Sequence, residues 1–154
     1  MATEPSPGQG MRLLLGVTAI NLYLFGAACL LLATSYPQLA EVGAEALPAF
    51  HASLSRRLAL AFILPEFLSA LSPLVLFWRR PASVSQGMVW LCLGLGMAWL
   101  VLTFTWHLPM QPLLAKGNAS PEVMHTLLTS HAVRTVLQAF KCGLLLWLVS
   151  RASP

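Results

Sequence analysis

The sequence has very few charged residues. Only 9% of its 154 residues are Asp, Glu, Lys or Arg, and hydrophobic residues make up 57%. Soluble domains typically have about 25% charged and about 45–50% apolar residues. With so little charge, and with a mean hydropathy of +0.73, the chain cannot cover a water-exposed surface, which excludes a soluble globular domain. Intrinsic disorder is excluded as well, because it requires low hydrophobicity.

The sequence also lacks the patterns of nucleic-acid-binding and zinc-binding proteins. No run of basic residues is longer than two, so the net charge of +4 does not indicate a nucleic-acid partner. The three cysteines, Cys29, Cys92 and Cys142, are far apart in apolar runs, and no CxxC motif occurs. Neither a zinc site nor a thiol–disulfide enzyme is therefore predicted. We interpret the cysteines as small buried hydrophobic residues.

Four long apolar runs occupy most of the chain. A helix of about 20 apolar residues crosses a bilayer, and its backbone must be hydrogen-bonded internally because the hydrocarbon holds almost no water. The runs that meet this requirement are about 12–34, 57–78, 87–106 and 132–150. They predict an all-α, integral membrane four-helix bundle of up-down-up-down topology, with a single transmembrane domain over 12–150. Residues 1–11 are expected to form a disordered tail and 151–154 a C-terminal tail.

The basic residues predict how the bundle is oriented. The first apolar run is longer than the roughly 7–15 residues of a signal-peptide core, so we interpret it as a retained anchor. With the N-terminus inside, four basic residues lie on the inner side and three on the outer side. Arg134 and Lys141 lie within the fourth run and are not counted. The inner residues are Arg12, Arg79, Arg80 and Arg151, and the outer ones are Arg56, Arg57 and Lys116. This favours a multi-pass protein with both termini in the cytoplasm, as in a bacterial inner membrane.

Two residues of opposite charge lie near the middle of predicted spans, Glu66 in the second and Lys141 in the fourth. A charge at this depth costs about 2.5–3.5 kcal/mol on insertion scales, so it has a structural or functional reason to be there. We expect Glu66 and Lys141 to form an ion pair or a hydrogen-bonded pair between the two helices. Such a pair either belongs to a site or only fixes the register of the helices.

The fourth run has a polar stripe. His131, Arg134, Gln138 and Lys141 follow one another at spacings of three, four and three residues, which places them on one helical face. In a membrane helix, such a stripe faces the interior of the bundle or a water-filled cavity. The stripe is the main evidence in the sequence for a functional site.

All four histidines are predicted to lie toward one side of the membrane: His51, His107, His125 and His131. Imidazole can transfer protons near neutral pH, bind a metal or ligate haem. Thr103 precedes His107 by four residues, so the two can face the same way. No HxxxH pair occurs and few carboxylates lie near, so no metal ligand and no cofactor are predicted; haem or a metal on His107 and His131 is the alternative. Tyr36 is interpreted as an interfacial aromatic residue.

Two segments resemble a known family. Residues 107–114 have the sequence HLPMQPLL, and residues 128–135 have the sequence LTSHAVRT. This is similar to the anthrone oxygenase-like family of small four-helix membrane proteins, most of unknown function. Its members tend to have Pro-x-Asn after the third helix and His-x-x-Arg-Thr at the start of the fourth. His131, Arg134 and Thr135 match the second motif, and Pro109 matches the first, with Gln111 in place of the Asn. The resemblance implies the same fold and, from a few relatives, cofactor-independent oxygenation of phenolic polyketides.

The first functional hypothesis is an enzyme, or an enzyme-like binder, of an amphipathic or aromatic small molecule. His131 would act as general acid or base, Arg134 would hold a developing oxyanion, and His107 would assist. Gln138, Gln111 and Thr103 are the candidate substrate-binding residues.

Three other functions remain open from the sequence. A redox module would use His107 and His131 as ligands of haem or a metal. A non-catalytic accessory subunit of a membrane complex, or a homo-oligomer, would use the Glu66–Lys141 pair only to hold its fold. A dimeric transporter would line its pathway with Glu66, Lys141 and Gln138.

Overall fold

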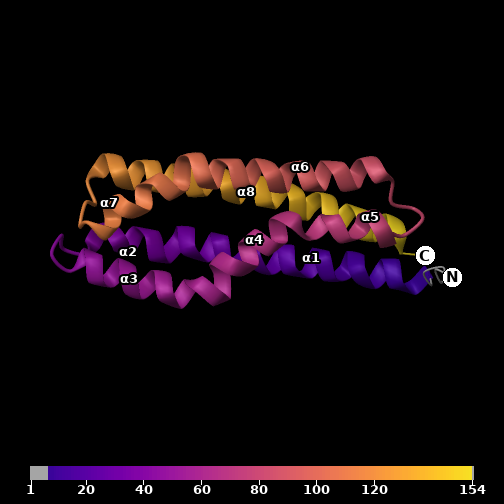
Figure 1. The fold of residues 1–154 in the computed structure, drawn as a ribbon, viewed down its shortest axis with the longest axis horizontal. Helices are drawn as coiled ribbons and strands as arrows, with labels where there is room; N and C mark the ends of the chain where they lie inside the picture. Colours follow the sequence, from indigo (N-terminus) through magenta and orange to yellow (C-terminus); the bar gives the residue numbers. More distant parts are fainter. Residues whose placement is uncertain (1–6, 154) are drawn as a thin grey trace.

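The computed structural model describes residues 7–153, and over that range the chain is helical with no strand. Four long helical rods run up and down in one bundle, and the two ends of the chain lie at the same end of it (Figure 1). Each rod is long and apolar enough to cross a membrane, and we number the four spans in chain order: Gly8–Glu41, Leu47–Arg79, Gln86–Ala115 and Pro121–Ala152. The predicted four-helix membrane bundle is confirmed.

Short irregular turns divide the first three spans. The first contains α1 (Pro7–Leu30), a π-helical segment (Leu31–Ser35) and α2 (Tyr36–Glu41). The second contains α3 (Leu47–Leu58), a π-helical segment (Ala59–Ile63), α4 (Leu64–Leu71), a 3-10 turn (Ser72–Leu74) and α5 (Val75–Arg79). The third contains α6 (Gln86–Leu102), a π-helical segment (Thr103–His107), a 3-10 turn (Leu108–Met110) and α7 (Gln111–Ala115). The fourth is one helix, α8 (Pro121–Ala152).

The π-helical segments have a common cause in the sequence. Each is followed within two residues by a proline, namely Pro37, Pro65 or Pro109. Proline has no N–H, and its ring clashes with the carbonyl one turn earlier, so a regular α-turn cannot precede it. The wider turn gives the ring room and keeps the neighbouring backbone groups hydrogen-bonded, which a membrane helix requires.

The helices extend further than the apolar runs predicted. The second span begins at Leu47 rather than 57, and the fourth begins at Pro121 rather than 132. Hydropathy finds only the part that crosses the hydrocarbon, about 30 Å, whereas the 32 residues of α8 make a helix about 48 Å long. The predicted tails also change: residues 7–11 belong to α1 and 151–152 to α8, while residues 1–6 lie outside the described part.

The interior consists of two apolar cores with a polar layer between them. On α8, the buried polar residues from Ser130 to Lys141 lie between Leu127 of one core and Leu145 of the other. The core at the chain termini includes Leu14, Leu76, Val89 and Leu145, and the core at the opposite end includes Leu39, Leu47, Leu114 and Leu127. The polar layer contains all four residues of the predicted stripe, each of them buried.

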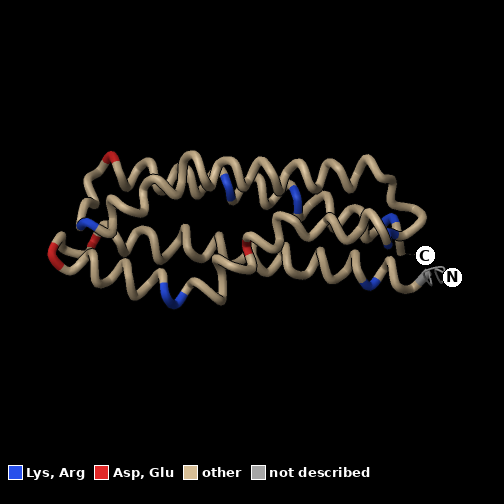
Figure 2. The backbone as a smooth tube through the Cα atoms, viewed as in Figure 1, with Lys and Arg blue, Asp and Glu red and all other residues tan. Residues whose placement is uncertain are grey.

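The outer surface of the bundle is apolar. Large hydrophobic side chains are exposed on every span, and Leu60 (79%), Trp78 (74%) and Phe140 (67%) are among the most exposed. Most charged residues lie toward the two ends of the bundle (Figure 2), and of those in between, Glu66, Arg134 and Lys141 are buried. Water would be a poor solvent for this surface, so the chain is a multi-pass membrane protein with lipid around its middle.

A glycine allows the second and third spans to pack closely. A Cβ atom placed on Gly96 of α6 would overlap the carbonyl oxygen of Ala70 on α4. Small residues permit such close approaches between membrane helices. Gly94, two residues earlier, is exposed, and a methyl group added there would meet no atom within 4 Å.

Gly96→Ala is therefore expected to lower the free energy of unfolding by about 1–3 kcal/mol, because the added methyl group forces α4 and α6 apart. Gly94→Ala is the matched control and should not destabilise the bundle. Thermal unfolding of both variants in detergent, followed by circular dichroism, checks this. Equal melting temperatures for the two variants would contradict the close α4–α6 contact.

Candidate functional site

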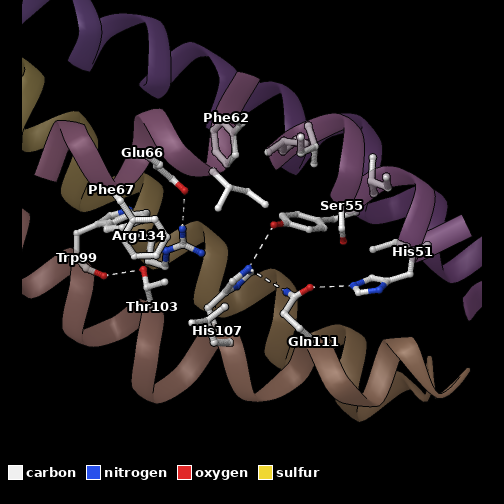
Figure 3. Close-up of a pocket in the computed structure, with 17 residues that line it drawn as sticks. His51, Ser55, Phe62, Glu66, Phe67, Trp99, Thr103, His107, Gln111 and Arg134 are labelled. Atoms are coloured by element: carbon white, nitrogen blue, oxygen red, sulfur yellow. Dashed lines mark hydrogen bonds and ion pairs between the residues drawn. The ribbon is translucent and has the colours of Figure 1, made fainter. Parts of the chain in front are cut away.

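A cavity of about 250 Å³ lies beside the core that is far from the chain termini. All four spans and all three π-helical segments contribute to its lining. Its polar lining residues are Tyr36, His51, Ser55, Glu66, Thr103, His107, Gln111 and Arg134. Its apolar lining residues are Leu31, Leu39, Leu54, Leu58, Phe62, Ile63, Phe67, Trp99 and Leu108. Figure 3 shows Glu66, Arg134, His107 and Gln111 on facing walls of this cavity.

An ion pair forms the deep end of the cavity. Arg134 Nη2 donates a hydrogen bond to Glu66 Oε2 at 3.1 Å, and both side chains are buried (Figure 3). The guanidinium carbon lies 4.4 Å from the ring centre of Trp99, so the indole covers one face of the cation. Within residues 7–153, Arg134 Nε and Nη1 have no hydrogen-bond partner. Arg134 therefore lines the cavity and has two N–H groups that no residue of this range satisfies.

This pairing corrects the sequence prediction for Glu66. Lys141 does not contact Glu66; its Nζ donates to the backbone oxygen of Ser69 at 2.6 Å, one turn further along the second span. The two residues were expected to meet because they lie at similar positions along their spans. Counting residues does not fix the axial register of helices that are distant in sequence, and the π-helical turn before Glu66 shifts that register further. The expected pair is replaced by Glu66–Arg134.

His107 is the centre of a hydrogen-bonded chain that crosses the bundle. Its Nδ1 lies 3.0 Å from Ser130 Oγ, and its Nε2 lies 3.3 Å from both the Tyr36 hydroxyl and Gln111 Nε2. The other end of the Gln111 amide, Oε1, lies 2.9 Å from His51 Nε2. The chain thus links α3, the third span, α2 and α8 through side chains that line or border the cavity (Figure 3).

The hydrogen bonds around His107 favour one tautomer. With the single hydroxyl hydrogen of Ser130 donated to the backbone oxygen of Leu127 at 2.9 Å, and with the Gln111 amide nitrogen facing Nε2, Ser130 Oγ accepts from His107 Nδ1–H. Nε2 is then unprotonated and accepts from Tyr36 and from the Gln111 amide. Both of these contacts are at 3.3 Å, longer than the usual range of about 2.7–3.2 Å. In this tautomer, His107 presents a weakly engaged, unprotonated nitrogen to the cavity.

His131 lies behind the cavity rather than in its lining. Its Nε2 donates to the backbone oxygen of Ala28 at 3.0 Å, and its ring packs edge-on against Tyr36 with centroids 4.6 Å apart. Its Nδ1 is buried without a hydrogen-bond partner in the described part of the chain. Since Tyr36 separates it from the cavity, His131 is placed to position that phenol.

The candidate substrate-binding residues divide into two groups. Thr103 and Gln111 line the cavity, and the Thr103 hydroxyl donates to the Trp99 carbonyl at 2.8 Å. Gln138 does not line it: its amide nitrogen donates to Asn21 Oδ1 at 3.1 Å and to the Asn21 carbonyl at 3.2 Å. Asn21 also bonds to Ser72 at 3.1 Å, so Gln138 ties together the first, second and fourth spans.

Sequence reasoning missed two polar cavity residues as site members, Tyr36 and Ser55. Tyr36 was interpreted as an interfacial aromatic residue, yet its side chain is buried between His107 and His131. The proline directly after Tyr36 was the available signal, because it predicts an irregular turn inside a membrane helix. His125, the fourth histidine, is exposed on α8 and does not line the cavity.

The histidines do not form a metal centre as they stand. Among residues 7–153, no three His, Cys, Asp or Glu side chains are close enough to hold a metal ion. The rings of His107 and His131 lie 5.9 Å apart, but three of their four nitrogens already form hydrogen bonds. The donor set around the cavity is thus suited to proton transfer and to binding oxygen atoms.

Comparison of the chain with models of protein families, with curated proteins and with solved structures finds no match.

Proposed function

We propose that this chain is a membrane enzyme that binds a hydroxylated aromatic small molecule and accepts a proton from it at His107 Nε2. The observation that supports this most strongly is the pairing of that unprotonated nitrogen with Arg134, whose Nε and Nη1 have no partner within residues 7–153, in one cavity. A base and a fixed cation facing the same space are what removal of a proton requires, because the cation stabilises the anion that results.

The walls of the cavity suit an aromatic ligand. Its volume of about 250 Å³ is slightly below the roughly 300–1,000 Å³ of sites for drug-sized molecules, so the ligand is small. Phe62, Phe67 and Trp99 offer ring faces and edges, against which a flat molecule packs well. The long bonds from Tyr36 and Gln111 to His107 can be replaced by a ligand hydroxyl at little cost.

The resemblance to the anthrone oxygenase-like family supports a specific reaction. A methylene group next to a phenolic ring system would lose a proton to His107, and the carbanion, held by Arg134, would react with dioxygen without a cofactor. Overall, the methylene carbon would lose two hydrogen atoms and gain one oxygen atom as a ketone, while the second oxygen atom and the two hydrogen atoms leave as water. The roles differ from those expected from the sequence: His107 becomes the base and His131 a positioning residue, while Arg134 keeps its role as the holder of an oxyanion.

Nitrophenol tests the proton transfer directly, because its anion is yellow and its neutral form is not. At a pH where free nitrophenol is mostly protonated, adding the protein in lipid nanodiscs is expected to produce the yellow anion in proportion to the bound fraction. Nitroanisole, which has the same ring and no acidic proton, is the control and should bind without this signal. Binding of nitrophenol with no anion formed would refute His107 as a base for this ligand class.

A further inference from the structure

The entrance to the cavity can be located from the exposure of its lining residues. The lining residues of the first and fourth spans, Leu31, Tyr36, Leu39 and Arg134, are all buried and form the floor. The exposed lining residues are Ile63 (40%) and Leu108 (38%), one from the second span and one from the third. The cavity therefore opens sideways, between these two spans.

This opening is closed at both of its ends. Toward the end of the bundle, the hydrogen bond of 2.9 Å from His51 to Gln111 joins α3 to α7 across it. Toward the middle of the bundle, the ring of Phe67 packs against Trp99 and Phe104 with centroids 6.0 and 5.8 Å apart, joining α4 to the third span. What remains open lies between these two closures, at the level of the π-helical segments.

The remaining opening faces lipid. Ile63 is flanked on the outer surface of the second span by Leu60 and Leu64, which are 79% and 52% exposed. On the third span, Phe104, one turn before Leu108, is 58% exposed. These residues belong to the apolar surface that surrounds the bundle, so the solvent outside the opening is hydrocarbon or the boundary between hydrocarbon and headgroups.

We propose that the cavity takes its ligand from the bilayer, through a lateral opening gated by Ile63 and Leu108, and that the ligand is a membrane-dissolved amphiphile with its oxygen atoms at one end. This inference rests on the proposed function for the identity of the ligand, but not for the position of the opening. The oxygen-bearing end enters toward Arg134 and His107, and the apolar part lies against Leu54, Leu58 and Phe62. A water-soluble ligand of the same shape has no route in.

Association kinetics of naphthol with the protein in nanodiscs test the gate. Ile63→Trp and Leu108→Trp are expected to slow both association and dissociation, each by about tenfold, because a gate raises the barrier between the free and the bound state. Leu64→Trp, on the same span as Ile63 but outside the lining, is the matched control and should behave as the wild type. Unchanged rates in both gate variants would overturn the proposal. Naphthol binding does not require proton transfer, so this result is independent of the nitrophenol experiment.

A second measurement needs no ligand. A spin label on Phe62→Cys, inside the cavity, is made in a Cys29→Ser background because Cys29 is exposed. We expect the label to be relaxed more strongly by dioxygen, which concentrates in lipid, than by a water-soluble nickel chelate. Labels on Leu64→Cys and on Ala44→Cys, in the turn between the first two spans, give the lipid and water references. Stronger relaxation by the nickel chelate at position 62 would place the opening in water and overturn the proposal.

Discussion

Arg134→Leu is expected to lower the free energy of unfolding by about 3–5 kcal/mol, because it leaves the Glu66 carboxylate buried without its partner. The Glu66 side chain is only about one-tenth exposed, so bulk water solvates the carboxylate poorly once the guanidinium is gone. Loss of the contact with the Trp99 ring adds to the effect. Denaturant unfolding in detergent, followed by circular dichroism, measures the change.

The double variant Glu66→Leu/Arg134→Leu should recover most of that stability. Replacing both members of a buried pair with apolar residues is often neutral, because the cost of desolvating two charges disappears together with their attraction. A large coupling free energy between positions 66 and 134 is therefore expected in a double-mutant cycle. Recovery in the double variant also separates loss of the pair from general damage to the bundle.

Lys141 supplies the control for this cycle. If Glu66 pairs with Arg134 and not with Lys141, the effects of Glu66→Leu and Lys141→Met should add within about 0.5 kcal/mol. Lys141→Met removes a hydrogen bond to the Ser69 carbonyl and also a buried charge, so its own effect should be small. A strong coupling between positions 66 and 141 would show that α8 is one turn out of register with the second span.

The fold was predictable because bilayer physics leaves few alternatives. Four apolar runs in a chain with 9% charge must be helices, and short connections between them produce an up-and-down bundle. The polar face of α8 could also be predicted from the sequence, because a spacing of three and four residues depends on the geometry of one helix alone. His131, Arg134, Gln138 and Lys141 are all buried, as an inward-facing stripe requires.

The partners of that stripe could not be predicted, because they depend on relations between helices. Which residue faces Arg134 depends on axial register, and an error of about one turn exchanges Glu66 for Ser69. Which histidine faces the cavity depends on the rotation of the spans, and the π-helical turn at Thr103–His107 changes that rotation locally. The sequence did not identify Tyr36 as a site residue for a different reason: an aromatic residue near the end of a membrane span is usually interfacial.

The choice between the two histidines leads to the second large effect. His107→Asn is expected to abolish the nitrophenol anion signal, because it removes the base that accepts the proton; a positioned base usually contributes about 10²–10⁴-fold to such a transfer. The Asn amide nitrogen lies near the position of the imidazole Nδ1, so it can still hydrogen-bond to Ser130, and the polar layer and the fold should be retained. His131→Gln places its amide nitrogen near the position of the imidazole Nε2, so it can keep the hydrogen bond to the Ala28 carbonyl, and it leaves Nε2 of His107 in place. Its anion signal should fall less than about tenfold, through a looser Tyr36.

The amount of nitrophenol anion formed at equal bound fraction separates these two variants. Because the comparison is made at equal occupancy, a change in affinity does not enter it, and circular dichroism shows whether each variant is folded. A greater loss in His131→Gln than in His107→Asn would return the base to the residue first expected from the sequence. That result would require the ring of Tyr36 to move aside when a ligand binds, because Tyr36 now separates His131 from the cavity. An equal and small loss in both variants would leave Arg134 as the only residue of the site that acts on the ligand, and the cavity would then bind an oxygen-bearing molecule without proton transfer.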